Sequence, residues 1–341
     1  MQEHGIKFTS CDEETARDFL TNRTYFFKLK AFENNFSKID DQYVNLDFAY
    51  LMDLSIIDCH LRTLLNYCCL NAEHALKVRF NKLIMNDSSE DGYNIVQYFD
   101  PNGTYRFTGF GPDSRYGRSL YTEGLLQKYF NDPAVWNLWE VITFRTLCDL
   151  YEKYLEKRRF KDNVTNLFQS VRIMRNASSH NNCLLIGVRK NIRITIYTQN
   201  CLTELGRVLQ TSTKVLYNPM KQYPLIHDFI STLCAFLILV DSPGVRRELK
   251  GQLNQFSNRL HKRFDYTKMQ QETQLAITIH ALQKVSDIVA DYIEISDTDF
   301  AANKILHTQP VSIKPKGIQQ IHNMALGRNA EQNITRLINH M

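Results

Sequence analysis

The sequence predicts an all-α protein. Apolar side chains recur at helical spacing over most of the chain. The 341 residues include only 13 glycines and 8 prolines, the residues that most often interrupt helices. A hydrophobic content of 43% with 23% charged residues is ordinary for a soluble globular protein. We therefore expect a helical bundle with one irregular insertion.

The first helical pattern covers residues 13–36. Phe26 and Phe27 lie at spacings that build an apolar face, with Lys28 and Lys30 among them. Residues 48–80 follow as one or two long helices without a proline, and their leucines share one side. The same pattern places Asp58 and Arg62 away from that side, so we expect them outside the apolar stripe.

The insertion covers about residues 86–119 and is expected to be a loop or hairpin. It contains turn signals at Pro101-Asn102-Gly103. Aromatic residues there alternate with Arg106, Arg115 and Arg118, a composition that suits stacking on RNA bases. The alternative is that these aromatics only anchor the loop to the core.

Helical patterns return after Pro133 and again from Val164 to about Met174, and they dominate residues 203–295. The last 41 residues hold five Lys and Arg against one acid, which predicts a basic tail. We expect a first domain at residues 1–200 and a helical C-terminal region with this tail at 201–341.

Several classes of protein are disfavoured by the sequence. The most apolar run, Phe229–Val240, is shorter than the roughly 20 residues that span a bilayer, so we expect a buried core helix and no membrane partner. The polar opening does not resemble a secretory signal. Eight scattered cysteines lack the spacing of metal ligands, so we expect thiols in a cytoplasmic protein with no metal and no cofactor.

Positive charge is concentrated in residues 151–195, where ten Lys and Arg face three acids. This excess suits a polyanionic partner such as RNA. It includes the run Lys157-Arg158-Arg159-Phe160-Lys161, although such runs often form only a solvated face.

The same segment contains Arg175-Asn176 and, five residues after the arginine, His180. Histidine transfers protons near neutral pH, and arginine pairs with phosphate oxygens. Asn176 would orient either group. In one ideal helix, residues five apart lie about 140° apart around the axis. The helix must therefore end or bend between Arg175 and His180, or a second copy must complete the site. The alternative is a surface arginine and a histidine that caps a helix.

The string from Val171 to Leu185 resembles the R-N-x-x-x-H element of HEPN ribonucleases, in particular the Abi family of bacterial abortive-infection proteins of the AbiD/AbiF type. Three further blocks resemble that family in the same order: residues 25–36, the pair of segments 53–62 and 73–80, and residues 139–144. Together they span about residues 20–186.

The resemblance implies an all-helical HEPN-like Abi domain at residues 1–200 and a role in phage defence or toxin–antitoxin function. It implies a metal-independent endoribonuclease that leaves a 2′,3′-cyclic phosphate, works as a homodimer and, in some members, holds a small non-coding RNA. The alternative function is an RNA-binding regulatory module that holds a structured RNA without cleaving it. The expected catalytic residues are Arg175, Asn176 and His180, and the expected RNA contacts are Lys77, Arg79, Arg106, Arg115, Arg118, Lys157, Arg158, Arg159, Lys161 and Arg172.

Overall fold

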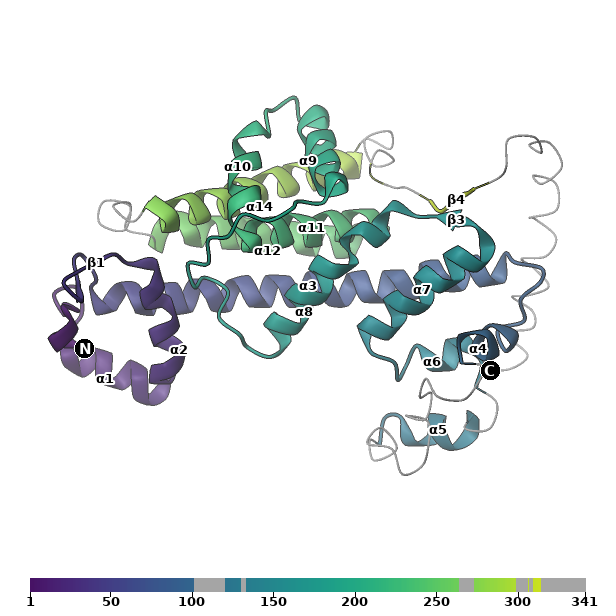
Figure 1. Ribbon diagram of the computed structural model, residues 1–341, viewed down its shortest axis with the longest axis horizontal. Helices are drawn as coiled ribbons and strands as arrows, with labels where there is room; N and C mark the ends of the chain where they lie inside the picture. Colours follow the sequence, from purple (N-terminus) through teal and green to yellow (C-terminus); the bar gives the residue numbers. More distant parts are fainter. Residues whose placement is uncertain (101–119, 130–132, 264–272, 299–305, 307–308, 314–341) are drawn as a thin grey trace. The chain divides into compact units, whose positions relative to one another are not determined.

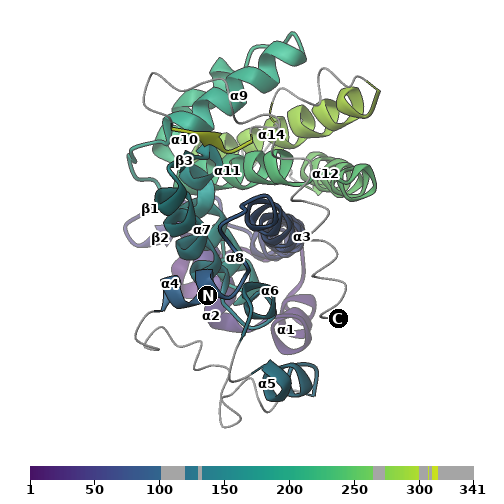
Figure 2. The same cartoon turned by 90° about the vertical axis from the view of Figure 1, so that its right-hand side faces the viewer.

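The computed structural model describes residues 1–100, 120–129, 133–263, 273–298, 306 and 309–313. Helices dominate this part of the chain, as Figures 1 and 2 show. Its strands are two residues long and form two antiparallel pairs, β1 with β2 and β3 with β4. The predicted all-α fold class is confirmed.

The chain folds into two compact units that are not consecutive in sequence. One consists of residues 1–72 and 166–308, the other of residues 73–165 and 309–341. This grouping differs from the linear boundary expected near residue 200. The reason is that α8 (Phe168–Ser179) packs on α11 (Pro224–Leu239), so the motif helix shares its unit with the C-terminal helices.

The first unit begins with short elements. The expected single helix over residues 13–36 is wrong, because the chain breaks at residues 23–25, where the N–H groups of Arg23 and Thr24 both bond to the carbonyl of Phe19. The elements are η1 (Gln2–His4), α1 (Glu13–Asn22), α2 (Phe26–Lys30), η2 (Ala31–Asn35), β1 (Lys38–Ile39) and β2 (Gln42–Tyr43).

The long predicted helix is a single one, α3 (Phe48–Met85), which begins in the first unit and ends in the second. No glycine or proline occurs within it. The leucine stripe is buried as predicted, with Leu51, Leu54 and Leu61 fully inaccessible. Contrary to the expectation, Asp58 is also fully buried and Arg62 nearly so.

The C-terminal helices of the first unit surround α11. Almost every residue of α11 is buried, so the predicted core helix is confirmed. In the described ranges, no helix is long and apolar enough to cross a membrane. The helices α12 and α14 lie side by side (Figures 1 and 2). The elements of this region are α9 (Ile196–Val208), η5 (Lys214–Leu216), α10 (Tyr217–Gln222), α11, α12 (Pro243–Arg263) and α14 (Thr273–Thr298).

The second unit has an aromatic core centred on Phe80 of α3. Its ring lies 5.0 Å from that of Trp139 and 5.2 Å from that of Tyr151, measured between centroids. The elements around it are α4 (Asn94–Phe99), α5 (Glu123–Tyr129), α6 (Val135–Leu138), α7 (Phe144–Arg158), β3 (Phe160–Lys161) and β4 (Val311–Ser312), and η4 (Asn163–Leu167) leads into α8.

The predicted irregular insertion begins with turns over residues 86–93, and the short helix α4 follows within it. The remainder, with Arg106, Arg115 and Arg118, lies outside the described residues, as does most of the predicted basic tail.

A buried ion pair stabilises the second unit. The Arg79 guanidinium lies 2.8 Å from Oδ2 of Asp162, and the Tyr151 hydroxyl donates to the same oxygen at 2.6 Å. The Asp162 side chain is fully inaccessible. Burial, followed by the charge of Asp162, raises the pKa of Tyr151 well above its usual range, so the phenol stays protonated as the donor.

Arg79→Ala is expected to reduce the free energy of unfolding by about 3–5 kcal/mol, because it leaves a buried carboxylate without its cation. Lys77→Ala is the matched control. Lys77 forms a partly exposed pair with Glu73 at 3.6 Å, so its loss is expected to cost no more than about 1 kcal/mol. Urea unfolding measures both. Equal effects of the two substitutions would contradict a structural role for Arg79.

Candidate active site

The helix α8 carries the predicted catalytic residues. Its buried face contains Val171, Met174 and Ser178, at spacings of three and four residues that suit one side of a helix. This face is held on α11, where the Ser170 hydroxyl donates to Oδ1 of Asp228 at 2.7 Å. Arg175 is therefore half-buried, and Asn176 and His180 are exposed.

The end of α8 is closed by backbone hydrogen bonds immediately after the motif. His180 is the C-cap residue, and Asn181 adopts the left-handed conformation with a φ of 59°. The Asn181 N–H bonds to the carbonyl of Ser178 at 3.2 Å, and the Asn182 N–H bonds to that of Ala177 at 2.9 Å. This pair of bonds is a Schellman motif.

The helix thus remains regular up to Ser179 and ends there, although the N–H of His180 still bonds to the carbonyl of Asn176 at 3.0 Å. About 140° of helical rotation separates these two positions. An end of the helix between Arg175 and His180 is one of the two arrangements left open by the sequence, and completion of the site by a second copy stays a prediction.

A buried carboxylate fixes the segment that follows His180. Oδ1 of Asp58 accepts hydrogen bonds from the N–H of Leu184 at 2.7 Å and from that of Leu185 at 2.9 Å. Its other oxygen pairs with the guanidinium of Arg62, one helical turn further along α3. The sequence pattern missed this role. The spacing of four residues between Asp58 and Arg62 could have indicated an ion pair, since side chains at this spacing meet on a helix.

A second anchor holds the same segment from the other side. The Asn35 amide donates to the carbonyl of Leu185 at 2.7 Å and to that of Phe32 at 3.0 Å. Gly187 adopts a φ of 68°, and a Cβ there would lie only 3.0 Å from the carbonyl oxygen of Asn34. A side chain at this position would therefore both strain the backbone and force the two segments apart.

Cations lie beside the anchored segment. The Cys183 thiol contacts the carbonyl of Lys28 at 3.6 Å. Burial, and then the positive charge of Arg62, lower the pKa of Lys28. Ser179 at the end of α8 bonds through its hydroxyl to the Asn66 side chain of α3 at 3.3 Å. The motif is thus bordered by polar and basic groups of α2 and α3.

Of the expected RNA contacts, only Arg172 shares the motif's unit and helix, where it bonds to Gln169. In the second unit, Lys157 pairs with the buried Glu90 at 2.8 Å, and Arg158 pairs with Asp87 at 2.6 Å. These pairs neutralise part of the charge run at the end of α7. Arg159 ends that helix with a φ of 53°, and Lys161 is exposed on β3. RNA contact by all these residues stays a prediction.

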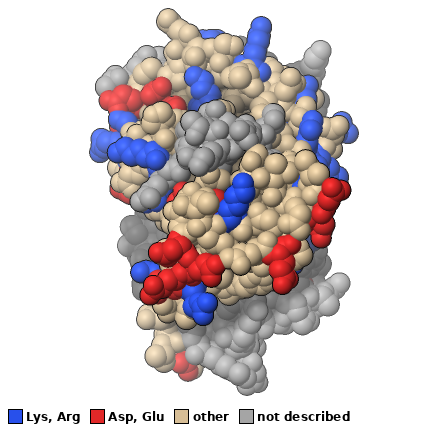
Figure 3. All heavy atoms as spheres, turned by 90° about the vertical axis from the view of Figure 1, so that its left-hand side faces the viewer, with Lys and Arg blue, Asp and Glu red and all other residues tan. Residues whose placement is uncertain are grey.

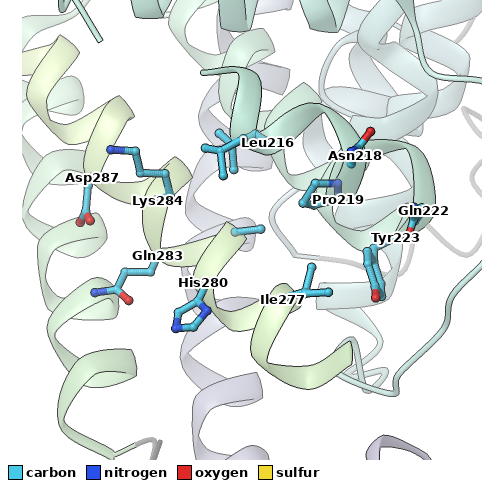
Figure 4. A pocket seen from close by; sticks show the side chains of 12 residues that line it. Leu216, Asn218, Pro219, Gln222, Tyr223, Ile277, His280, Gln283, Lys284 and Asp287 are labelled. Atoms are coloured by element: carbon cyan, nitrogen blue, oxygen red, sulfur yellow. The ribbon is translucent and has the colours of Figure 1, made fainter. Parts of the chain in front are cut away.

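A separate cavity of about 710 Å³ lies among the C-terminal helices of the first unit. Figure 4 shows that His280, Lys284 and Asp287 of α14 line one side of it. Leu216, Pro219 and Tyr223 line the other side. None of the predicted site residues contributes to its lining.

Comparison with known families supports the resemblance that the four ordered sequence blocks indicate. Residues 18–185 match the family model of the Abi-like proteins. The chain is an Abi-like protein over this range. The match links it to abortive infection, a form of phage defence. No curated protein and no solved structure matches the chain.

The matched range of this Abi-like protein ends at Leu185, the residue held by both Asp58 and Asn35. It therefore contains the end of α1 and the whole of α2, α3 and α8, together with the contacts that join α2, α3 and the end of α8. The cavity in Figure 4 lies beyond it.

Asp58→Ala is expected to reduce the free energy of unfolding by about 3–5 kcal/mol, because it leaves Arg62 as a buried cation without a counter-charge. Hydrogen exchange at the amides of Leu184 and Leu185 is expected to accelerate, since both lose their acceptor. Asp58→Asn keeps an acceptor oxygen and is expected to have a smaller effect.

Glu204→Ala is the control, because Glu204 forms an exposed pair with Arg207 within α9. It is expected to leave the unfolding midpoint and both exchange rates unchanged. Unchanged amide exchange in Asp58→Ala would show that the carboxylate does not hold this segment.

Proposed function

We propose that this Abi-like protein is a metal-independent endoribonuclease of phage defence, with Arg175, Asn176 and His180 as its catalytic residues. The proposal is supported by the exposure of His180 and by the fixed position of the backbone that follows it. His180 is exposed at the end of a rigid helix whose following segment is fixed by the buried Asp58. An exposed imidazole on a fixed backbone is suited to proton transfer with a bound substrate.

The reaction is cleavage of RNA by its own 2′-hydroxyl. An imidazole removes the 2′-hydroxyl proton, and the resulting 2′-oxygen attacks the adjacent phosphorus. The bond from phosphorus to the 5′-oxygen breaks, and a second proton donor protonates that oxygen as it leaves. The products are a 2′,3′-cyclic phosphate and a 5′-hydroxyl.

The residues of the motif divide these tasks. His180 acts as the general base or acid, because an imidazole exchanges protons near neutral pH. Arg175 stabilises the charge that develops on the phosphate oxygens, since its planar guanidinium pairs with two of them. Asn176 orients one of these two groups through its amide.

A homodimer completes this proposed site. Residues five apart in an ideal helix lie about 140° apart around its axis, and in this proposal a second copy supplies the group that one chain does not bring to the same phosphate. Two-fold pairing of the ends of α8 brings a second copy of each group to the same place. One imidazole then serves as the base and the partner's His180 as the acid.

His180→Ala is expected to lower the rate of RNA cleavage by about 10²- to 10⁴-fold, the usual contribution of a general acid or base. The assay uses end-labelled RNA with EDTA and identifies the ends of the products. His4→Ala is the control, because His4 is an exposed histidine of η1, outside the motif.

Full cleavage by purified His180→Ala would disprove the assignment. RNA binding without any cleavage by the unmodified protein would instead favour a regulatory RNA-binding module.

Mixed dimers test whether both copies form one site. When unmodified and His180→Ala chains are co-expressed in equal amounts, random pairing leaves about one quarter of the dimers with two intact copies. Cleavage per total protein is therefore expected to fall to about one quarter of the unmodified level. A fall to only about one half would show that each chain acts independently.

A further inference from the structure

The short helix α2 exposes three consecutive aromatic residues, Tyr25, Phe26 and Phe27. Their exposed fractions are 61%, 50% and 78%. The sequence pattern placed Phe26 and Phe27 on a buried apolar face, and the structure contradicts this. The residues of the segment that face the core are Leu29 and Phe32, both fully buried.

The break after α1 explains this exposure. Because the chain turns at residues 23–25, α2 begins a new helical phase at Phe26. The N–H groups of Lys28 and Leu29 both bond to the carbonyl of Tyr25, which fixes the turn with Leu29 inward. Three consecutive large aromatic side chains are therefore exposed to solvent, and clustered exposed apolar residues are typical of binding surfaces.

The surroundings of these aromatics are basic. Residues 22–36 contain Arg23, Lys28 and Lys30 as cations and Glu33 as the sole acid. Glu33 is buried and accepts a hydrogen bond from the Tyr43 hydroxyl at 2.9 Å. The Lys30 ammonium lies 6.0 Å from the centre of the Phe26 ring. The exposed charges of this segment are thus all positive.

The wider face carries charges of both signs. Figure 3 views the molecule from its α1 side and shows separate Lys and Arg side chains as well as groups of Asp and Glu. The basic character is therefore local to the segment, and a ligand that uses it must contact the aromatics as well.

The aromatics lie close to the motif within the same unit. The carbonyl of Lys28 contacts the thiol of Cys183, three residues after His180. Asp58 and Asn35 hold the next residues, Leu184 and Leu185, so the two segments are fixed to each other.

We propose that Tyr25, Phe26 and Phe27 form an aromatic platform on which bases of single-stranded RNA stack, with Lys28 and Lys30 contacting its phosphates. This inference rests on the proposed ribonuclease function and adds the kind of substrate. Aromatic faces beside cations bind single strands, because every unpaired base offers a face to stack on. Paired bases are already stacked within a duplex, so the platform selects single-stranded RNA.

The local charge favours RNA over a second copy of the chain as the occupant. A protein contact through this segment would bring several cations together without an exposed acid from the same segment to balance them. A phosphate backbone supplies that negative charge directly.

The test measures binding of a fluorescein-labelled 12-nucleotide single-stranded RNA to the full chain carrying His180→Ala, so that the RNA stays intact. In this background Phe27→Ala is expected to weaken binding about 10-fold or more, since stacking contributes about 1–3 kcal/mol per base. Phe27→Leu is expected to weaken it similarly, because leucine is apolar but has no aromatic face. Phe27→Trp is expected to retain binding.

Ile196→Ala is the matched control. Ile196 is an apolar residue of α9 in the same unit and is 73% exposed. Its substitution is expected to leave the affinity unchanged. A duplex of the same sequence is expected to bind with no sensitivity to Phe27.

The outcomes separate the two proposals. If the His180→Ala parent binds single-stranded RNA and Phe27→Ala binds it equally well, the platform is overturned while the ribonuclease proposal stands. If Phe27→Ala leaves RNA affinity intact but converts a dimer to a monomer in light scattering, the face is a contact between copies and the platform is again overturned. If the parent binds no RNA at all, both proposals fail.

Discussion

The carboxylate of Asp58 is the constraint on which the candidate site depends. A charged group that is fully inaccessible to water is costly unless its oxygens are well paired. Here one oxygen accepts two backbone N–H groups and the other faces a guanidinium. Because these donors come from α3 itself and from the segment after α8, satisfying the carboxylate also fixes the position of the motif's end. The donors that satisfy the buried Asp58 carboxylate thus also fix the backbone of the candidate site.

The sequence predicted much of this arrangement. The leucine stripe of α3, the buried α11 and the motif helix follow from spacing and composition, and the structure contains all three. The spacing of apolar residues gave the wrong burial for a residue whose position depends on tertiary contacts. It placed Asp58 away from the core, because an average pattern treats a carboxylate as exposed unless its partners are known. Those partners, Leu184 and Leu185, lie more than a hundred residues away in sequence.

The pattern failed at α2 for a different reason. Phe26 and Phe27 continue the apolar spacing of α1 only if the helix is continuous, and the break at residues 23–25 resets the phase. Breaks without glycine or proline leave little trace in a single sequence. The RNA contacts expected for Lys157 and Arg158 were inferred from net charge and stay predictions. Their ion pairs with Glu90 and Asp87 depend on how the chain folds back, which charge counting does not describe.

The packing of α8 on α11 has a consequence for synthesis of the chain. A nascent chain that stops after residue 187 already contains the whole motif and both of its anchors, Asp58 and Asn35. It lacks the apolar surface of α11, including the acceptor Asp228, on which the buried face of α8 rests. Domains that need distant segments are completed only when the last of those segments emerges from the ribosome. The motif helix therefore reaches its final packing only after α11 has been synthesised, late in translation.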